Sequence, residues 1–528
     1  MSTTSGFAAP ASTEDPLLAA SHGLETQPLL NRARTPGRLA SPYWVIPIVL
    51  VVSIARGMTM SPRIKVYNEI ACRAVGSPST NDSLLTVLVA EGCQSPEVQA
   101  RASKIQASVI TIMSVLSSAS TGLWSQWGDI RGRKIIFCVS IVGFIVMELV
   151  FLLVSGSISA ITRRGEAFIL VGPIFEGICG GLSVFNGVFH AYISDCTPDG
   201  SRSKIFSAIQ GMVFSGLAFG PWIAGALLSN TNLGPYSLFP ISITIQLVLL
   251  MYVIFFLPES LRKKRHQPSQ LVPEPTPMSG ATQSQTLTGL INRFAVAFVS
   301  PITIFRPRTV DDGVSTKKDF SMTLLGCALF LYILATAVYP LKYLYGQHTY
   351  GWDSVHLGYY MALLWISRAI NLLILLPIIV SYFKPKTPIT GAASPENIAL
   401  ELQFDKRLAR ASLSVDALGD LLIVIAPTSS QIPFIAASCL SSFTSGGNPA
   451  LHSLGAVCLH ALGHSNETGR LFGAVGVLNA IAHSVAPGMF ALTYSMTVST
   501  YPKTIFCVAA SLLFSSVILL GGIRAKGR

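Results

Sequence analysis

Apolar segments that are long enough to cross a lipid bilayer make up most of this sequence. A transmembrane helix needs about 20 mainly apolar residues to span the hydrocarbon core. Twelve segments approach that length, and a polar stretch separates them into two sets of six. The expected fold is therefore an all-α membrane protein with twelve transmembrane helices in two six-helix bundles. The predicted spans are 43–61, 104–127, 135–156, 167–193, 204–228 and 238–257, then 320–340, 355–382, 412–428, 432–458, 470–495 and 503–522.

The composition favours lipid over water as the main surroundings of the chain. Charged residues make up 12% of the 528 residues, whereas soluble domains have about 25%. So few charges cannot cover the surface of a soluble protein of this length, which excludes a soluble enzyme and a disordered scaffold. The net charge is +12, but no basic run is interleaved with aromatic residues on a polar segment. No nucleic-acid partner is therefore expected.

The distribution of basic residues predicts the orientation in the membrane. If both termini are cytoplasmic, 26 of the 37 Lys and Arg residues lie in cytoplasmic segments. Cytoplasmic loops carry such an excess, so this orientation is expected. The expected organisation is a disordered cytoplasmic tail at 1–42, a first bundle at 43–257, a cytoplasmic linker at 258–319, a second bundle at 320–522 with a charged cytoplasmic loop at 383–411, and a cytoplasmic tail at 523–528.

The segment 62–103 is predicted to be an external loop. It contains Cys72, Cys93 and a glycosylation sequon at Asn81. An external loop can hold a disulfide and a glycan, and the sequence leaves open whether the two cysteines pair. A second sequon, at Asn466, falls on the cytoplasmic side and should stay bare. The Cys and His spacings indicate no metal site, and no cofactor is expected.

The loop between the second and third segments reads Trp-Gly-Asp-Ile-Arg-Gly-Arg-Lys. It resembles the loop signature of the major facilitator superfamily, although three other positions of the signature differ. The resemblance implies the twelve-helix fold of that superfamily, with two pseudo-symmetric bundles around a central cavity, and solute transport as the function. The residues that match the signature are Asp129, Gly132, Arg133 and Lys134.

The same resemblance assigns a gate to this loop. Arg133 would pair with Asp195 at the cytoplasmic end of the fourth helix, and Arg202 follows at the start of the fifth. Charges at the boundary between lipid and water are less screened than charges at a soluble surface. Such pairs would hold one face of a transporter shut and break when it opens. The alternative is a basic anchor of the positive-inside type with no gating role.

Small residues surround a proline in the fifth segment. Small residues four positions apart allow close contact between helices, and proline removes a backbone hydrogen bond and kinks the helix. The residues are Gly216, Gly220, Pro221 and Gly225. The pattern resembles a Gly-Pro signature of proton-coupled antiporters of the superfamily, with Ala224 in place of one glycine. The alternative is a packing face that is independent of the direction of transport.

Ionisable residues inside the apolar spans are the candidate cavity residues, because each costs several kcal/mol unless it is paired or hydrated. Asn448 is added because it lies between a Gly-Gly pair and a proline, which would unwind the tenth helix. The resemblance implies that Arg56, Glu176, Arg368 and His483 face the central cavity, and it does not assign Glu148 to that face. The set is Arg56, Glu148, Glu176, Arg368, His483 and Asn448. Asp416 and Asp420 are expected to be interfacial, near the cytoplasmic start of the ninth helix.

Two of these residues have an expected chemical role. Glu176, in a cavity of low dielectric constant, would take up and release a proton near neutral pH. Arg368 carries a fixed charge, which suits an anionic group of the substrate or a carboxylate counter-ion. The alternative is a structural ion pair, such as Arg56 with Glu176, that never contacts the substrate.

Short runs narrow the resemblance. The run from Tyr192 to Asp195 and the later Gly-Arg-Leu-Phe-Gly at 469–473 are similar to fungal members and, less closely, to the proton-coupled folate transporter group. In the N-terminal tail, Glu25, Leu29 and Leu30 fit an acidic dileucine sorting signal. Both the plasma membrane and a vacuolar or lysosomal membrane therefore stay open as locations.

The expected function is secondary active transport of a small organic solute, coupled to protons and working by alternating access. A proton-driven drug or metabolite exporter and a solute sensor that does not transport are the alternatives. The sequence has no zinc-protease, nucleophile-elbow or His-box spacing and no ATP-binding P-loop, so an enzyme is not expected. The expected partners are a small-molecule substrate, protons and the lipid bilayer, and the chain is expected to be monomeric.

Overall fold

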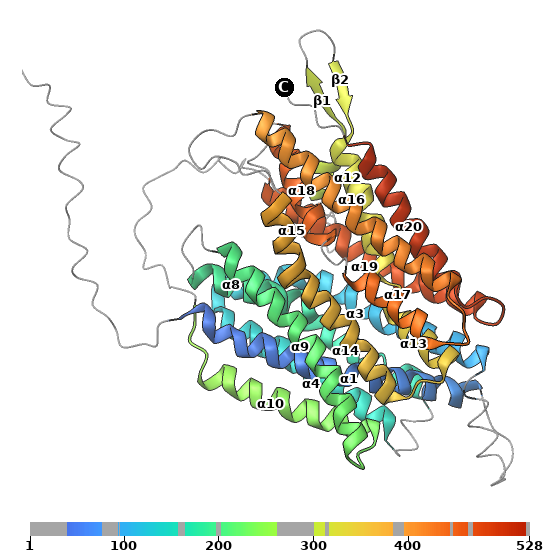
Figure 1. Cartoon of the computed structure of the whole chain (residues 1–528). Helices are drawn as coiled ribbons and strands as arrows, with labels where there is room; N and C mark the ends of the chain where they lie inside the picture. The colour runs from blue at the N-terminus through green and yellow to red at the C-terminus, as the bar shows by residue number, and fades with distance from the viewer. Residues whose placement is uncertain are drawn as a thin grey trace, which may run out of the picture. The chain divides into compact units, whose positions relative to one another are not determined.

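The computed structural model describes residues 40–75, 93, 95–156, 164–196, 202–260, 300–311, 316–383, 395–443, 447–462 and 468–523. These residues are almost entirely helical (Figure 1). The sorting motif at Glu25, Leu29 and Leu30 and the sequons at Asn81 and Asn466 lie outside the described residues, as does most of the linker.

The first half contains the first six crossings. Its fourth crossing is divided into α6, α7 and α8, and the chain turns between α7 and α8 at Gly180 and Gly181, whose φ angles are +91° and +52°. The elements are η1 (Pro42–Val45), α1 (Ile46–Val75), α3 (Pro96–Arg131), α4 (Arg133–Ser155), α6 (Gly165–Phe168), α7 (Val171–Ile178), α8 (Gly181–Cys196), α9 (Arg202–Asn230), η2 (Pro235–Ser237) and α10 (Leu238–Phe255).

The second half includes a short antiparallel hairpin in the predicted linker. Helices α12 and α13 form the seventh crossing, and α14, a π-helical turn η4 and α15 form the eighth. The elements are η3 (Ser300–Phe305), β1 (Arg308–Asp311), β2 (Thr316–Asp319), α12 (Ser321–Thr336), α13 (Tyr339–Tyr350), α14 (Ser354–Ile370), η4 (Asn371–Leu375), α15 (Leu376–Phe383), α16 (Pro395–Ile425), α17 (Gln431–Phe443), α18 (Gly447–Ala461), α19 (Thr468–Thr497) and α20 (Thr504–Gly521).

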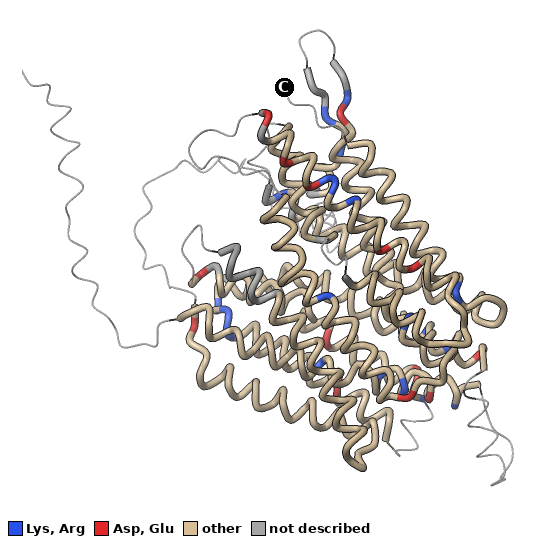
Figure 2. The backbone as a smooth tube through the Cα atoms, viewed as in Figure 1, with Lys and Arg blue, Asp and Glu red and all other residues tan. Residues whose placement is uncertain are grey.

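Ten helical stretches among the described residues are long and apolar enough to cross a membrane. The ninth predicted crossing, α16, is not among them because its apolar second part also contains Arg410, Asp416 and Asp420, and the tenth is divided between α17 and α18. Charged residues gather near the helix ends, and few interrupt the middle of the helices (Figure 2). These few residues form the candidate site.

Several predicted boundaries were wrong, because charged residues that suggested loops lie inside the bundle. Helix α1 continues through Pro62 to Val75 and α3 begins at Pro96, so the external loop predicted at 62–103 is helical at both ends. The side chain of Arg63 is only 14% exposed and is paired with Glu148. A buried counter-charge thus allows the helix to continue past a basic residue.

The second half shows the same effect. The seventh crossing continues past its predicted end at 340, and Lys342 is fully buried. Residues 395–411, which were predicted as part of a cytoplasmic loop, form the first part of α16. Asp416 and Asp420 therefore lie well inside that helix and are buried, rather than interfacial.

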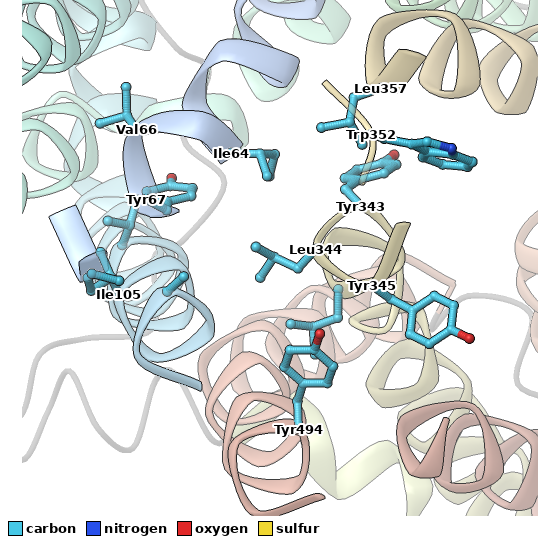
Figure 3. Close-up of a cluster of buried hydrophobic side chains, with 14 of the residues drawn as sticks. Ile64, Val66, Tyr67, Ile105, Tyr343, Leu344, Tyr345, Trp352, Leu357 and Tyr494 are labelled. Carbon is cyan, nitrogen blue, oxygen red and sulfur yellow. The ribbon is translucent and has the colours of Figure 1, made fainter. Parts of the chain in front are cut away.

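The two halves share a hydrophobic core at one end. We call the end of the bundle that carries Gly132 the Gly132 end, and the opposite end, which carries Cys72, the Cys72 end. Separate core clusters lie within the first half and within the second half. A third cluster brings Ile64 and Tyr67 of α1 together with Leu344, Trp352 and Tyr494 of the second half (Figure 3). This shared cluster holds the halves together at the Cys72 end.

Hydrogen bonds between the halves follow the same pattern. Side-chain hydrogen bonds join the halves at the middle and at the Cys72 end of the bundle. They are Ser61–Ser354 (2.5 Å), Asn68–Gln347 (2.6 Å), Ser229–Tyr359 (3.3 Å) and Thr111–Ser484 (3.3 Å). At the Cys72 end, Cys72 and Cys93 are also joined in a disulfide, with their Cα atoms 5.1 Å apart.

Helix α9 packs closely on both halves through its small residues. A Cβ atom at Gly220 would lie 2.5 Å from the carbonyl oxygen of Ile54, and the ring of Pro221 lies against Gly57 of α1. Farther along, a Cβ at Gly225 would lie 3.2 Å from the ring of Tyr359 on α14. The glycines of the fifth segment therefore allow one helix to contact its own half and the other half.

Candidate functional site

One face of α1 carries the two arginines that pair with buried acids of the first half. Arg56, Thr59 and Arg63 are spaced three or four positions apart, which places them on one side of a helix. Arg56 Nη1 lies 2.8 Å from Glu176 Oε1 on α7. Glu176 is fully buried, and the guanidinium of Arg56 stacks 4.6 Å from the ring centre of Phe144. The expected pair of Arg56 with Glu176 is thus formed.

A second ion pair lies one or two turns farther along α1. Arg63 Nη2 is 2.6 Å from Glu148 Oε1, and the Thr59 hydroxyl donates a hydrogen bond of 2.8 Å to the same oxygen. Glu148, on α4, is fully buried. Arg56, Arg63, Glu148 and Glu176, which we call the first-half charge cluster, therefore pair their charges within the first half.

The second half has a corresponding arrangement. Lys342 Nζ on α13 lies 2.7 Å from Asp420 Oδ1 on α16 and donates a hydrogen bond of 3.1 Å to the Ser441 hydroxyl. The two charged side chains are 1% and 4% exposed. The cation belongs to the seventh crossing and the acid to the ninth, as Arg63 and Glu148 belong to the first and third. The ion pair is repeated at an offset of six crossings.

Asp416 and Arg368 complete the second-half charge cluster, which we define as Lys342, Arg368, Asp416 and Asp420. The guanidinium of Arg368 lies 3.9 Å from the ring centre of Tyr339 and 4.9 Å from that of Trp365. Its Nε atom, and Oδ1 of Asp416, are buried and have no hydrogen-bond partner among the described residues. This cluster therefore keeps polar atoms available for a ligand or a proton.

Arg368 lies near the contact between the halves. Trp365, one turn earlier on α14, stacks on Phe214 of α9 with ring centres 5.8 Å apart. The indole Nε1 of Trp365 is also buried without a hydrogen-bond partner in the described part of the chain. Two unused donors and two aromatic rings thus meet at the boundary of the two halves.

His483 lines a cavity between the halves, as its predicted position in the eleventh helix suggests. The cavity has a volume of about 110 Å³ and is lined by Ser103 and Gln106 of α3, Thr336 of α12 and His483 of α19. Gln106 Oε1 is buried without a hydrogen-bond partner within the described ranges. Asn448 is the second residue of α18, and its side chain lies outside the described part of the structure.

A separate polar cluster lies at the Gly132 end. Arg133 Nε is 3.2 Å from Asp195 Oδ2, the pair that the loop resemblance implies, and the Ser260 hydroxyl donates to the same oxygen at 3.1 Å. The carboxylate of Glu259 accepts hydrogen bonds from the backbone N–H groups of Arg133 (2.8 Å) and Lys134 (3.1 Å). Glu259 thus caps the first turn of α4. The side chains of Asp129 and Arg202 lie outside the described part of the structure.

Gly132 is required where α3 turns into α4. Its φ of +109° and ψ of +157° fall in a region that only glycine adopts readily. A Cβ atom there would lie 2.3 Å from Glu259 Oε2. The residue therefore permits both the turn and the close approach of the cap.

Sequence reasoning missed Arg63, Lys342 and Glu259, and it placed the two aspartates of α16 wrongly. For Arg63 and Lys342 the available signal was the apolar sequence that continues beyond each of them. For Glu259 no local pattern indicates that it would cap a helix 126 residues earlier in the chain.

Two helical halves that bury paired charges and share a hydrophobic core at one end are the arrangement expected of a membrane transport protein. The family model described as the Major Facilitator Superfamily matches residues 81–487, and the chain belongs to this superfamily. The superfamily and its helical membrane fold, both predicted from the sequence, are thereby confirmed, and ten of the twelve predicted crossings have the length and hydropathy of a membrane helix among the described residues.

Relatives and solved structures agree with this assignment. The MFS-type transporter avaJ of Aspergillus versicolor is 24% identical over 514 residues, which cover 94% of this chain and 93% of the relative. The D-xylose–proton symporter has a similar fold, with a TM-score of 0.58 at 13% identity over 92% of this chain and 99% of that one. The human organic anion transporter MFSD10 has a TM-score of 0.55 at 16% identity, over 92% and 100% of the two chains.

Proposed function

We propose that this transporter moves a small organic anion, that protons drive the movement, and that the two halves expose the site alternately to the two sides of the membrane. The observation that carries the proposal is Arg368. Its guanidinium is held by aromatic rings rather than by a carboxylate, with Nε unpaired, beside the contact between the halves. A buried cation without a carboxylate partner is costly, and an anionic solute would supply that partner.

The conformation supports alternating access. The halves share core residues and hydrogen bonds at the Cys72 end. With both termini in the cytoplasm, this is a state that is closed to the outside. The Arg133–Asp195 pair and the Glu259 cap then stabilise the cytoplasmic end of the first half.

The first-half charge cluster has a structural role in this proposal. Glu176 and Glu148 each accept a hydrogen bond from an arginine in a fully buried position. Protonation of either acid would leave an arginine uncompensated, at a cost of several kcal/mol. Of the two roles expected for Glu176, this geometry favours the ion pair with Arg56 over proton uptake.

Replacing Arg368 with alanine will weaken anionic solutes far more than neutral ones. A lost charge-assisted hydrogen bond is worth about 1.5–3 kcal/mol, or roughly 10- to 150-fold in affinity. Small carboxylates and their matched neutral amides, for example benzoate and benzamide, should be compared as ligands of the purified protein by isothermal titration calorimetry. Equal losses for acid and amide would assign Arg368 a structural role.

Export by antiport is the second candidate, and the close packing of Gly216, Gly220 and Gly225 on α9 favours it through the resemblance noted above. The direction of solute flux relative to the proton gradient distinguishes symport from antiport. In proteoliposomes with an imposed pH gradient, symport moves the probe solute with the protons and antiport moves it against them. Binding without counterflow would indicate a sensor instead.

Glycosylation tests the proposed orientation. Replacing Asn81 with glutamine is expected to remove the mass shift that an endoglycosidase produces, because Asn81 would face the lumen of the secretory pathway. The Asn466→Gln variant is the matched control and should leave the shift unchanged. Loss of the shift in the control alone would mean that the orientation is reversed.

Fluorescence microscopy of the tagged full chain, with and without Leu29 and Leu30 replaced by alanine, shows in which cellular membrane the protein resides.

A further inference from the structure

The second-half charge cluster contains an unpaired carboxylate, whereas both carboxylates of the first-half charge cluster are paired with arginines. Asp420 is paired with Lys342, whereas Asp416, one turn earlier on the same helix, makes no hydrogen bond or ion pair with any described residue. Asp416 is 6% exposed, and its Oδ1 is buried. An ionised carboxylate that is buried without a partner costs far more than a neutral one. In this conformation the environment of Asp416 therefore favours the protonated acid.

The groups that face Asp416 come from four helices. Tyr332 on α12, Tyr339 on α13 and Asp420 on α16 line the same small cavity as Asp416. Lys342 on α13 is bonded to Asp420 and Ser441, and Arg368 on α14 lies over the ring of Tyr339. Arg368 is thus the cation that is available to Asp416, and in this structure it lies over Tyr339 instead.

A small cavity gives Asp416 access to a water molecule. It has a volume of about 10 Å³ and is lined by Asp416, Asp420, Tyr332, Tyr339 and Thr336. A water molecule needs about 10–15 Å³ of such volume and two to four polar partners. The hydroxyls of Tyr332, Tyr339 and Thr336 are suitable partners. Thr336 also lines the larger cavity between the halves, so the two cavities share one lining residue.

We propose that Asp416 binds the coupling proton and that Arg368 links this proton to the solute. This inference rests on the proposed function. When an anionic solute occupies Arg368, Asp416 takes a proton from water and stays neutral. When the solute leaves, the proton passes back to water, and the Asp416 carboxylate pairs with Arg368. The guanidinium of Arg368 therefore binds either the anionic solute or the Asp416 carboxylate, but only one of them at a time.

The proton on Asp416 can be observed without knowing the solute. Infrared spectroscopy of the full chain in lipid should show the C=O stretch of a protonated carboxylic acid appear as the pH is lowered, because without solute a proton must replace Arg368 as the partner of Asp416. This band should disappear in Asp416→Asn and remain in Asp405→Asn, a matched control on the same helix whose buried carboxylate is bonded to Ser453. A band that persists in Asp416→Asn, or that is absent from the wild type at every pH, would overturn the proposal.

Transport tests the coupling separately. In proteoliposomes with a gradient of one pH unit across the membrane, cotransport of one proton with each solute molecule can raise the internal solute concentration to about tenfold the external one. The probes are phthalate and succinate, which are dianions at neutral pH and cross a bilayer slowly without a carrier. Asp416→Asn should reduce the accumulation of a transported probe to about onefold while keeping its counterflow, and Asp405→Asn should keep both. Accumulation by Asp416→Asn would refute the role of Asp416. If the wild type accumulates no probe, the proposed function fails for these anions, and the infrared result alone decides about Asp416.

Discussion

The Glu176→Gln variant will unfold more easily than the wild type by about 3–5 kcal/mol, because it leaves Arg56 charged and unpaired inside the first half. The pair is 2.8 Å long, Glu176 is fully buried, and Arg56 is 12% exposed. Water cannot replace the lost carboxylate at such a position. Thermal unfolding in detergent, followed by size-exclusion chromatography of the fluorescently tagged full chain, measures the loss.

Two further variants make this test specific. The double variant Arg56→Gln, Glu176→Gln removes both charges and should recover most of the lost stability, since a neutral pair carries no uncompensated charge. Glu166→Gln is the matched control, because the Arg101–Glu166 pair is about 40% exposed and exposed pairs contribute about 0–1 kcal/mol. If Glu176→Gln melts at the same temperature as Glu166→Gln, Arg56–Glu176 is not a structural pair.

Gly132→Ala is expected to cause the second large loss. The backbone conformation alone costs a residue with a side chain about 1–3 kcal/mol. The new methyl group would also displace the carboxylate of Glu259 from the start of α4, and loss of a helix cap costs about 0.5–2 kcal/mol. The measured quantities are the unfolding temperature and the amount of monodisperse protein.

The chain offers a matched control for this change. A Cβ at Gly122, inside α3, would meet no atom within 4 Å, so Gly122→Ala should be neutral or slightly stabilising. Adding Glu259→Ala to Gly132→Ala removes the clash but not the backbone strain or the loss of the cap, so only part of the stability should return. Full stability in Gly132→Ala would show that the turn does not depend on glycine.

The architecture was predictable because its signal is strong and local. Runs of about 20 apolar residues predict membrane helices with few alternatives, and the loop at Gly132 indicated the superfamily. Arg56 and Glu176 were found because each interrupts an apolar run. Their pairing was expected as one alternative, but the 120 residues that separate them in sequence carry no information about distance.

The errors have one physical cause. Arg63, Lys342, Asp416 and Asp420 lie near predicted helix ends, where a charge usually marks the membrane surface. Each is buried instead, and the ion pairs that offset the cost for Arg63, Lys342 and Asp420 are made with other helices. Sequence periodicity describes one helix at a time, so it cannot show a counter-charge on a neighbour. The same limit applies to Glu259, whose role depends on a helix far from it in the chain.

The most direct test of the account measures how far apart the two halves lie at each end. Spin labels at Ser125 and Leu400 report on the Gly132 end, and labels at Asn230 and His356 report on the Cys72 end, in a chain that keeps only the Cys72–Cys93 pair. Double electron–electron resonance should show two distances for each pair. We predict that lowering the pH or adding a transported anion shortens the first distance while it lengthens the second. A single distance for each pair at every pH and with every anion would contradict alternating access.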